Sequence, residues 1–64
     1  MLKEFLKNYR LKHNLSQKKM AELCGTAQCY YSQIETGVKK PGFTMISKLA
    51  KVIGCEESFL RSLL

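Results

Sequence analysis

Tryptophan and aspartate are absent from this 64-residue chain, and proline and histidine occur once each, at Pro41 and His13. No stretch of apolar residues is long enough to serve as a secretory signal or to cross a bilayer, so neither is expected. Because His13 has no cysteine or carboxylate cluster near it in the sequence, we expect no metal site and no cofactor.

Acidic residues are scarce: five glutamates stand against eleven lysines and arginines, which gives a formal net charge of +6. This excess favours a polyanionic partner, nucleic acid before membrane, and the alternative is a merely solubilising surface. The three cysteines are odd in number and lack the paired spacing of a metal site. Reduced thiols and a cytoplasmic location are therefore expected.

The length of the chain predicts a single domain over residues 1–64, with no separate effector-binding domain and no small-molecule ligand. The sequence holds no nucleophile–base pair, no pair of carboxylates and no glycine-rich phosphate loop, so we do not expect an enzyme. Nothing alternates with period two for long enough to make a strand. The predicted fold class is all-α, with five helices separated by short turns.

The first two helices have clear signals at their ends. The first carries an apolar stripe at helical spacing, formed by Leu2, Phe5, Leu6 and Tyr9. Its lysines are expected to point away from that stripe, toward solvent: Lys3, Lys7 and Lys12. Asn14 suits the left-handed turn that ends this helix. Ser16 is a typical N-cap for the second helix, which should end at Gly25.

The remaining helices follow from apolar periodicity and from breaking residues. A third helix is expected over residues 27–36, followed by a loop over residues 38–43 that contains proline and glycine. A fourth helix should carry its apolar residues between 46 and 53, and a short last helix is expected over residues 57–64. These segments leave no room for a linker or an internal repeat.

The most informative pattern is QKKMAELCGTAQCYYSQIET, over residues 17–36. A small residue, a glycine and an apolar residue at this spacing, here Ala21, Gly25 and Ile34, let two helices cross closely around a tight turn. In a small basic protein, that geometry serves mainly to place the second helix in the major groove of DNA. The sequence therefore predicts a sequence-specific DNA-binding domain.

The segment LSQKKMAELCGTAQCYYSQIETGVKKP resembles the helix-turn-helix core of the phage lambda repressor/Cro-like (XRE-type) regulators. The residues that match the family pattern are Leu15, Ser16, Gln17, Ala21, Gly25, Ile34, Glu35, Gly37 and Pro41. The resemblance implies a five-helix lambda repressor-like fold in which helix 27–36 is the recognition helix. The chain departs from the family at Ala27, where a capping Ser or Thr is usual, and at Tyr31, where a β-branched residue usually packs.

The resemblance implies that the outer face of the recognition helix contacts bases. That face is expected to carry Gln28, Cys29, Ser32 and Gln33. Glutamine offers a paired donor and acceptor to the edge of adenine, and serine reaches either kind of base edge. Cys29 suits contact with a thymine methyl group. The alternative is that all of these are only solvent-exposed residues.

Phosphate contacts position a protein on DNA without carrying sequence information. The resemblance places them at the start of the second helix and around the loop after the recognition helix, at Gln17, Lys39, Lys40, Phe43 and Thr44. Tyr30 is a secondary candidate, and its alternative is packing against the first helix or the loop.

Regulators of this family often pair an arginine of the first helix with the glutamate of the I-E-x-G segment. The resemblance therefore implies a partly buried ion pair between Arg10 and Glu35, which would tie the recognition helix to the first helix. Removal of one partner of such a pair is expected to destabilise the domain strongly.

One recognition helix covers only a few base pairs, so we expect a homodimer that reads an inverted repeat in double-stranded DNA. The resemblance implies a regulator of a prokaryotic or phage-infected cell, and we expect a repressor because so short a chain has little surface to spare for polymerase. Candidate dimer contacts are the apolar residues of the last helix, Phe59, Leu60, Leu63 and Leu64; the alternative is that they close the core of the monomer. A different interpretation of the whole chain is a protein-interaction module on the same fold, such as an antitoxin-like or co-regulator domain.

Overall fold

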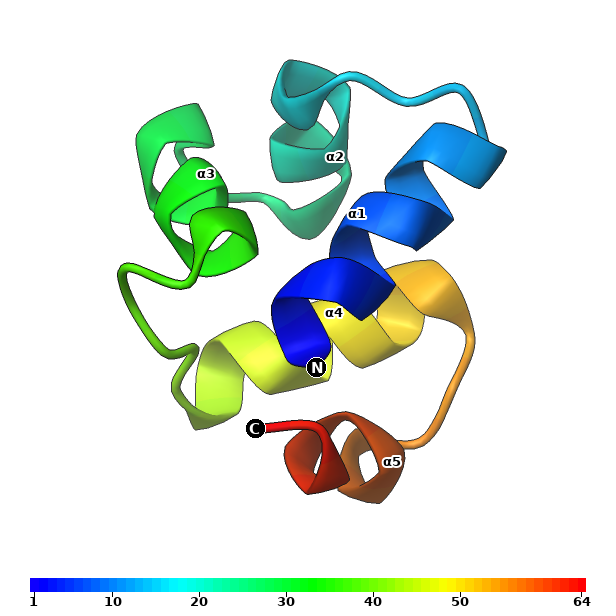
Figure 1. The fold of residues 1–64 in the computed structure, drawn as a ribbon, viewed down its shortest axis with the longest axis vertical. Helices are drawn as coiled ribbons and strands as arrows, with labels where there is room; N and C mark the ends of the chain where they lie inside the picture. The colour runs from blue at the N-terminus through cyan, green and yellow to red at the C-terminus, as the bar shows by residue number, and fades with distance from the viewer.

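The computed structural model describes all 64 residues and contains five α-helices and no strand. The helices are α1 (Leu2–Lys12), α2 (Gln17–Cys24), α3 (Gln28–Thr36), α4 (Phe43–Ile53) and α5 (Glu57–Ser62). In Figure 1, α2 and α3 lie together at one side, α1 lies in front of α4, and α5 closes the opposite end. The two termini are adjacent, because the Leu2 amide donates to the Leu63 carbonyl at 3.1 Å. The predicted all-α, five-helix fold is confirmed.

The local signals between the first three helices act as predicted. Asn14 has a φ of +54°, which lets the chain turn after α1. The Ser16 hydroxyl accepts a hydrogen bond from the Lys19 amide at 3.0 Å and so caps α2. Gly25 ends that helix with a φ of +67°, a left-handed conformation that a β-carbon would penalise. Asn14 and Ser16 therefore shape the turn between α1 and α2, and Gly25 shapes the turn between α2 and α3.

Three helix boundaries differ from the prediction. Helix α3 begins at Gln28, with Ala27 as an N-cap that makes no side-chain hydrogen bond. Helix α4 begins at Phe43, because the extended backbone of Gly42 takes the N-cap position that the sequence assigned to the loop. Helix α5 ends at Ser62, because the last two amides of the chain donate to carbonyls three residues back instead of four.

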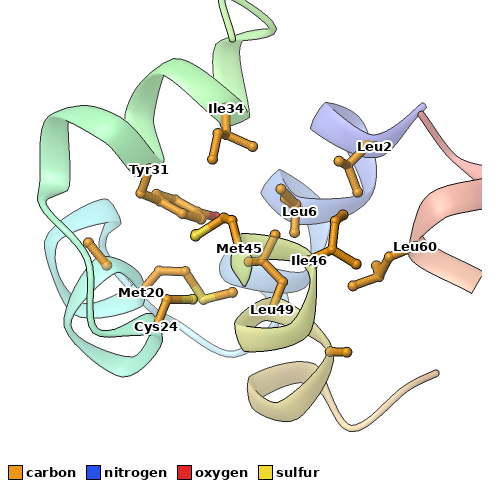
Figure 2. Packing of buried hydrophobic residues seen from close by; sticks show 12 residues of the cluster. Leu2, Leu6, Met20, Cys24, Tyr31, Ile34, Met45, Ile46, Leu49 and Leu60 are labelled. Carbon is orange, nitrogen blue, oxygen red and sulfur yellow. The ribbon is translucent and has the colours of Figure 1, made fainter. Parts of the chain in front are cut away.

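The core is one cluster of buried apolar side chains, to which every helix contributes. Its members are Leu2, Leu6, Met20, Ala21, Cys24, Tyr31, Ile34, Met45, Ile46, Leu49, Ala50 and Leu60. Figure 2 shows the Tyr31 ring pointing into this cluster toward Met45. The ring departs from the family pattern, and it is accommodated by full burial in the core. None of the five helices has the length and apolar composition needed to cross a membrane.

Candidate nucleic-acid interface

The outer face of α3 carries polar side chains that the fold leaves free. Gln28 and Cys29 are exposed, and Ser32 and Gln33 are half-buried. None of these four side chains makes a hydrogen bond within the protein. Their donors and acceptors are therefore available to a partner laid along α3.

The opposite face of α3 anchors the helix to the rest of the domain. Tyr31 and Ile34 are buried in the core, and Glu35 is buried at 7% exposure. Because these residues hold one side of the helix rigidly, the four polar side chains are presented from a fixed support. A rigid support is what precise recognition of base edges requires.

An ion pair between Arg10 and Glu35 joins α1 to the inward face of α3. The Arg10 Nε donates to the two Glu35 carboxylate oxygens at 3.2 and 3.0 Å, and its Nη2 donates to Oε1 at 2.8 Å. The remaining Nη1 donates to the Leu15 carbonyl at 2.9 Å, just before α2. Burial alone would raise the pKa of the Glu35 carboxyl, but the hydrogen bond from Arg10, followed by the nearby Tyr31 hydroxyl and the Gln17 amide, outweighs it and holds that pKa below its ordinary value.

Gln17 belongs to this network, which the sequence did not indicate. Its side-chain amide donates to Glu35 Oε1 at 3.4 Å, so the first residue of α2 is linked to the last turn of α3. The contact depends on how α2 and α3 cross. No local sequence pattern predicts how close this crossing brings Gln17 to Glu35. It leaves one amide hydrogen and the side-chain oxygen of Gln17 without a partner in the protein.

The loop after α3 and the start of α4 form the second candidate contact region. Lys39, Lys40 and Thr44 are exposed, and the Phe43 ring is 79% exposed. Helix α4 has no side-chain cap and no acidic residue in its first turn. Its first backbone amides therefore keep the positive potential of an uncapped helix N-terminus.

Tyr30 and Cys29 are neighbours on α3 with different surroundings. The Tyr30 ring is half-buried and packs against the core cluster, beside a surface hollow that it shares with residues at the start of α4. Cys29 is the one exposed cysteine, whereas Cys24 is buried and Cys55 is half-buried. Much of the Tyr30 ring is therefore covered by packing, which is one of the two roles expected for this residue.

The candidate dimer residues separate into two groups, and the expectation for Leu60 is corrected. Leu60 is fully buried in the core of the monomer, and Leu63 is half-buried against it. Phe59 and Leu64 remain 46% and 54% exposed. Leu60 lies inward because α5 folds back along α4 toward its start, where Arg61 lies over the Phe43 ring, a placement that apolar periodicity alone does not specify.

The Tyr31 hydroxyl is the one buried side-chain polar atom without a hydrogen-bond partner. Burial, and secondly the nearby Glu35 carboxylate, raise the pKa of Tyr31 far above its ordinary value, so the phenol is neutral. A buried polar group without a partner destabilises the folded state.

We expect Tyr31→Phe to raise the free energy of unfolding slightly, by up to about 1 kcal/mol, because it removes that unpaired hydroxyl and keeps the ring. Urea denaturation of both proteins measures the change. A loss of stability in the variant would mean that the hydroxyl donates to Glu35 in solution, against this expectation.

Comparison with known proteins gives concordant matches. A helix-turn-helix family model matches residues 6–60. An uncharacterized HTH-type transcriptional regulator, YqaF of Bacillus subtilis, is 30% identical over 54 residues, which are 84% of this chain and 71% of YqaF. An uncharacterized HTH-type transcriptional regulator of Mycobacterium tuberculosis is 33% identical over 49 residues, which are 77% of this chain but 35% of that protein.

A solved structure shares the fold over nearly the whole chain. It is the crystal structure of SinR, the master regulator for biofilm formation, in complex with DNA. SinR superposes with a TM-score of 0.81 and 27% sequence identity, over 95% of this chain and 98% of the SinR chain.

Proposed function

We propose that the chain, which belongs to the phage lambda repressor/Cro-like (XRE-type) family of helix-turn-helix transcriptional regulators, represses transcription by inserting α3 into the major groove of operator DNA. The observation that carries this proposal is the outer face of α3, whose four polar side chains have no partner within the protein. The bacterial relatives and the DNA-bound structure of SinR support it. The corresponding location is the cytoplasm of a bacterial or phage-infected cell.

Base recognition is assigned to the side chains on that face. Gln28 and Gln33 each present an amide donor and acceptor, which matches the N6 and N7 atoms of adenine. Ser32 lies on the same face and reaches either kind of base edge, and the Cys29 thiol is placed to contact a thymine methyl group. Gln28 stands in the first turn, at the end of the recognition helix that enters the groove in this family.

Phosphate contacts are assigned to the flanks of α3. Gln17 donates its free amide hydrogen to a phosphate of one DNA strand. Its hydrogen bond to Glu35 holds it in a fixed position relative to α3. On the side of the loop after α3, phosphates are bound by Lys39 and Lys40 and by the uncapped backbone amides of Phe43 and Thr44. Tyr30 adds a secondary contact through its hydroxyl. Such contacts fix the position of the protein on DNA and supply salt-dependent affinity.

The operator is expected to be an inverted repeat bound by a homodimer. A nine-residue recognition helix spans only about 14 Å, so one copy contacts too few base pairs for useful selectivity. Phe59 and Leu64 keep exposed apolar surface that suits contact between copies, with Leu63 at its edge. Occupation of the operator is sufficient for repression, whereas activation requires an additional surface for polymerase.

Selection from a library of random DNA duplexes, at near-physiological salt, tests this function. The protein should enrich an inverted repeat with half-sites about one helical turn apart. Enrichment of a single half-site would leave base recognition intact and reject the dimer. Equal retention of all sequences would reject sequence recognition and favour the protein-interaction module on the same fold.

A further inference from the structure

A polar groove of about 480 Å³ lies between α1 and the C-terminal end of α3. Helix α1 contributes Lys3, Glu4, Lys7 and Arg10 to its lining. The other lining residues are Gln17, Glu35 and Thr36, so no hydrophobic side chain takes part. Helical periodicity predicts only that Lys3 and Lys7 face solvent, because the groove exists only once α1 has packed beside α3.

The charges in this groove do not cancel. Glu35 is neutralised by Arg10, and Glu4 pairs with the amino group of Met1. Lys3 and Lys7 have no carboxylate within ion-pair distance. The walls of the groove therefore carry two positive charges without acidic partners, and an anion is the ligand that they favour.

The position of the groove relates it to the base-contacting face of α3. Thr36 follows Cys29 and Ser32 at helical spacing of seven and four residues, so the groove opens where that face ends. Gln17, to which the proposed function assigns a phosphate, also lines the groove. DNA seated on α3 would therefore run past the mouth of the groove.

Lys3 also connects the groove to the loop after α3. Its side chain lies against Gly37, directly after the last turn of α3. A second surface hollow, next to the groove, is lined by Lys3 together with Lys39 and Lys40. Lys7, Lys3, Lys40 and Lys39 thus form a basic strip that passes the C-terminal end of α3.

We infer that Lys3 and Lys7 bind the sugar–phosphate backbone of the DNA that α3 reads, so that α1 adds a third backbone contact to those of Gln17 and the loop. The inference rests on the proposed function. A regular line of phosphates is the anion that matches a strip of lysines from two separate elements, and each neutralised phosphate releases condensed counterions. The two lysines add affinity but no sequence preference.

Fluorescence anisotropy with the selected operator and with an unrelated duplex, across a series of salt concentrations, tests this assignment. The test variant is Lys3→Ala with Lys7→Ala. The control is Lys12→Ala with Lys51→Ala, which removes the same two charges from exposed positions outside the groove and the strip. Melting temperatures of all proteins establish that each variant is folded.

We expect the test variant to bind both duplexes about tenfold more weakly, with a slope of log K against log salt shallower by about 1–2. The control should change the slope much less, and Lys3→Arg with Lys7→Arg should restore it. Equal weakening by test and control variants would mean that only net charge acts, and it would overturn the inference. Failure of the wild-type protein to bind either duplex would instead reject the proposed function.

Discussion

Replacement of Glu35 by alanine is expected to lower the free energy of unfolding by about 3–5 kcal/mol. The variant leaves the Arg10 guanidinium, whose side chain is 14% exposed, with only the Leu15 carbonyl as a partner. It also removes the acceptor of the Gln17 amide. A 64-residue domain has a total stability on the order of 3–10 kcal/mol, so this loss amounts to about a third or more of the total.

The chain contains a matched control for this effect. Glu57 pairs with Arg61 at 3.1 Å on the surface of α5, where both side chains are nearly half exposed. Glu57→Ala should therefore cost only about 0.3–0.5 kcal/mol. Urea denaturation measures both variants, and similar small losses would show that the Arg10–Glu35 pair does not hold α1 to α3.

The same carboxylate predicts a dependence of stability on pH. The pKa of Glu35 is lower in the folded protein than its ordinary value of 4.5. A depressed pKa contributes stability above the unfolded value and loses it as the pH falls through the folded value. The melting temperature of the wild-type protein should therefore decrease below about pH 4.5. Glu35→Gln, which has no group to titrate there, should show a smaller decrease over that range.

Removal of the two glutamine side chains from α3 should abolish most of the sequence preference. Each good amide–adenine pair is worth about 1–3 kcal/mol, which is roughly five- to 150-fold in discrimination. Gln28→Ala with Gln33→Ala should therefore bring affinity for the selected operator close to that for an unrelated duplex. Competition binding with both duplexes at one salt concentration measures the ratio.

Stability and backbone binding should be little affected in this double variant. Both glutamines lie on the outer face of α3 and make no side-chain hydrogen bond within the protein. Asn8→Ala, which removes an exposed amide from the far side of α1, serves as the control and should keep the full preference. An unchanged operator preference in the glutamine variant would remove these residues from base recognition.

Local signals explain why the fold was predictable from the sequence. Asn14, Ser16 and Gly25 each act through their own backbone or the adjacent turn, so their effects do not depend on distant contacts. The apolar stripe that helical periodicity gave the first helix likewise contains Leu2 and Leu6, which are buried in the core. These short-range rules, together with the family pattern, were sufficient for the order and the kind of the elements.

The remaining features depend on how helices pack. In the sequence, the spacing of Leu60 fits a core residue and a dimer contact equally well. Only the docking of α5 onto α4 buries it in the monomer. The hydrogen bond from Gln17 to Glu35 requires the crossing of α2 and α3. The polar groove and the adjacent hollow, where Lys3 lies near Lys39, both require α1 to lie beside the end of α3. No single segment of sequence carries that information.

Alkylation of Cys29, with and without a saturating amount of the selected operator, tests the insertion of α3 into DNA most directly. Cys29 is the exposed thiol on the outer face of α3, and the half-buried Cys55, after α4, is an internal reference. Peptide mass spectrometry should show that operator DNA slows modification of Cys29 strongly and leaves Cys55 unchanged. Unchanged modification of Cys29 in protein that is demonstrably bound to DNA would contradict insertion of this face into the major groove.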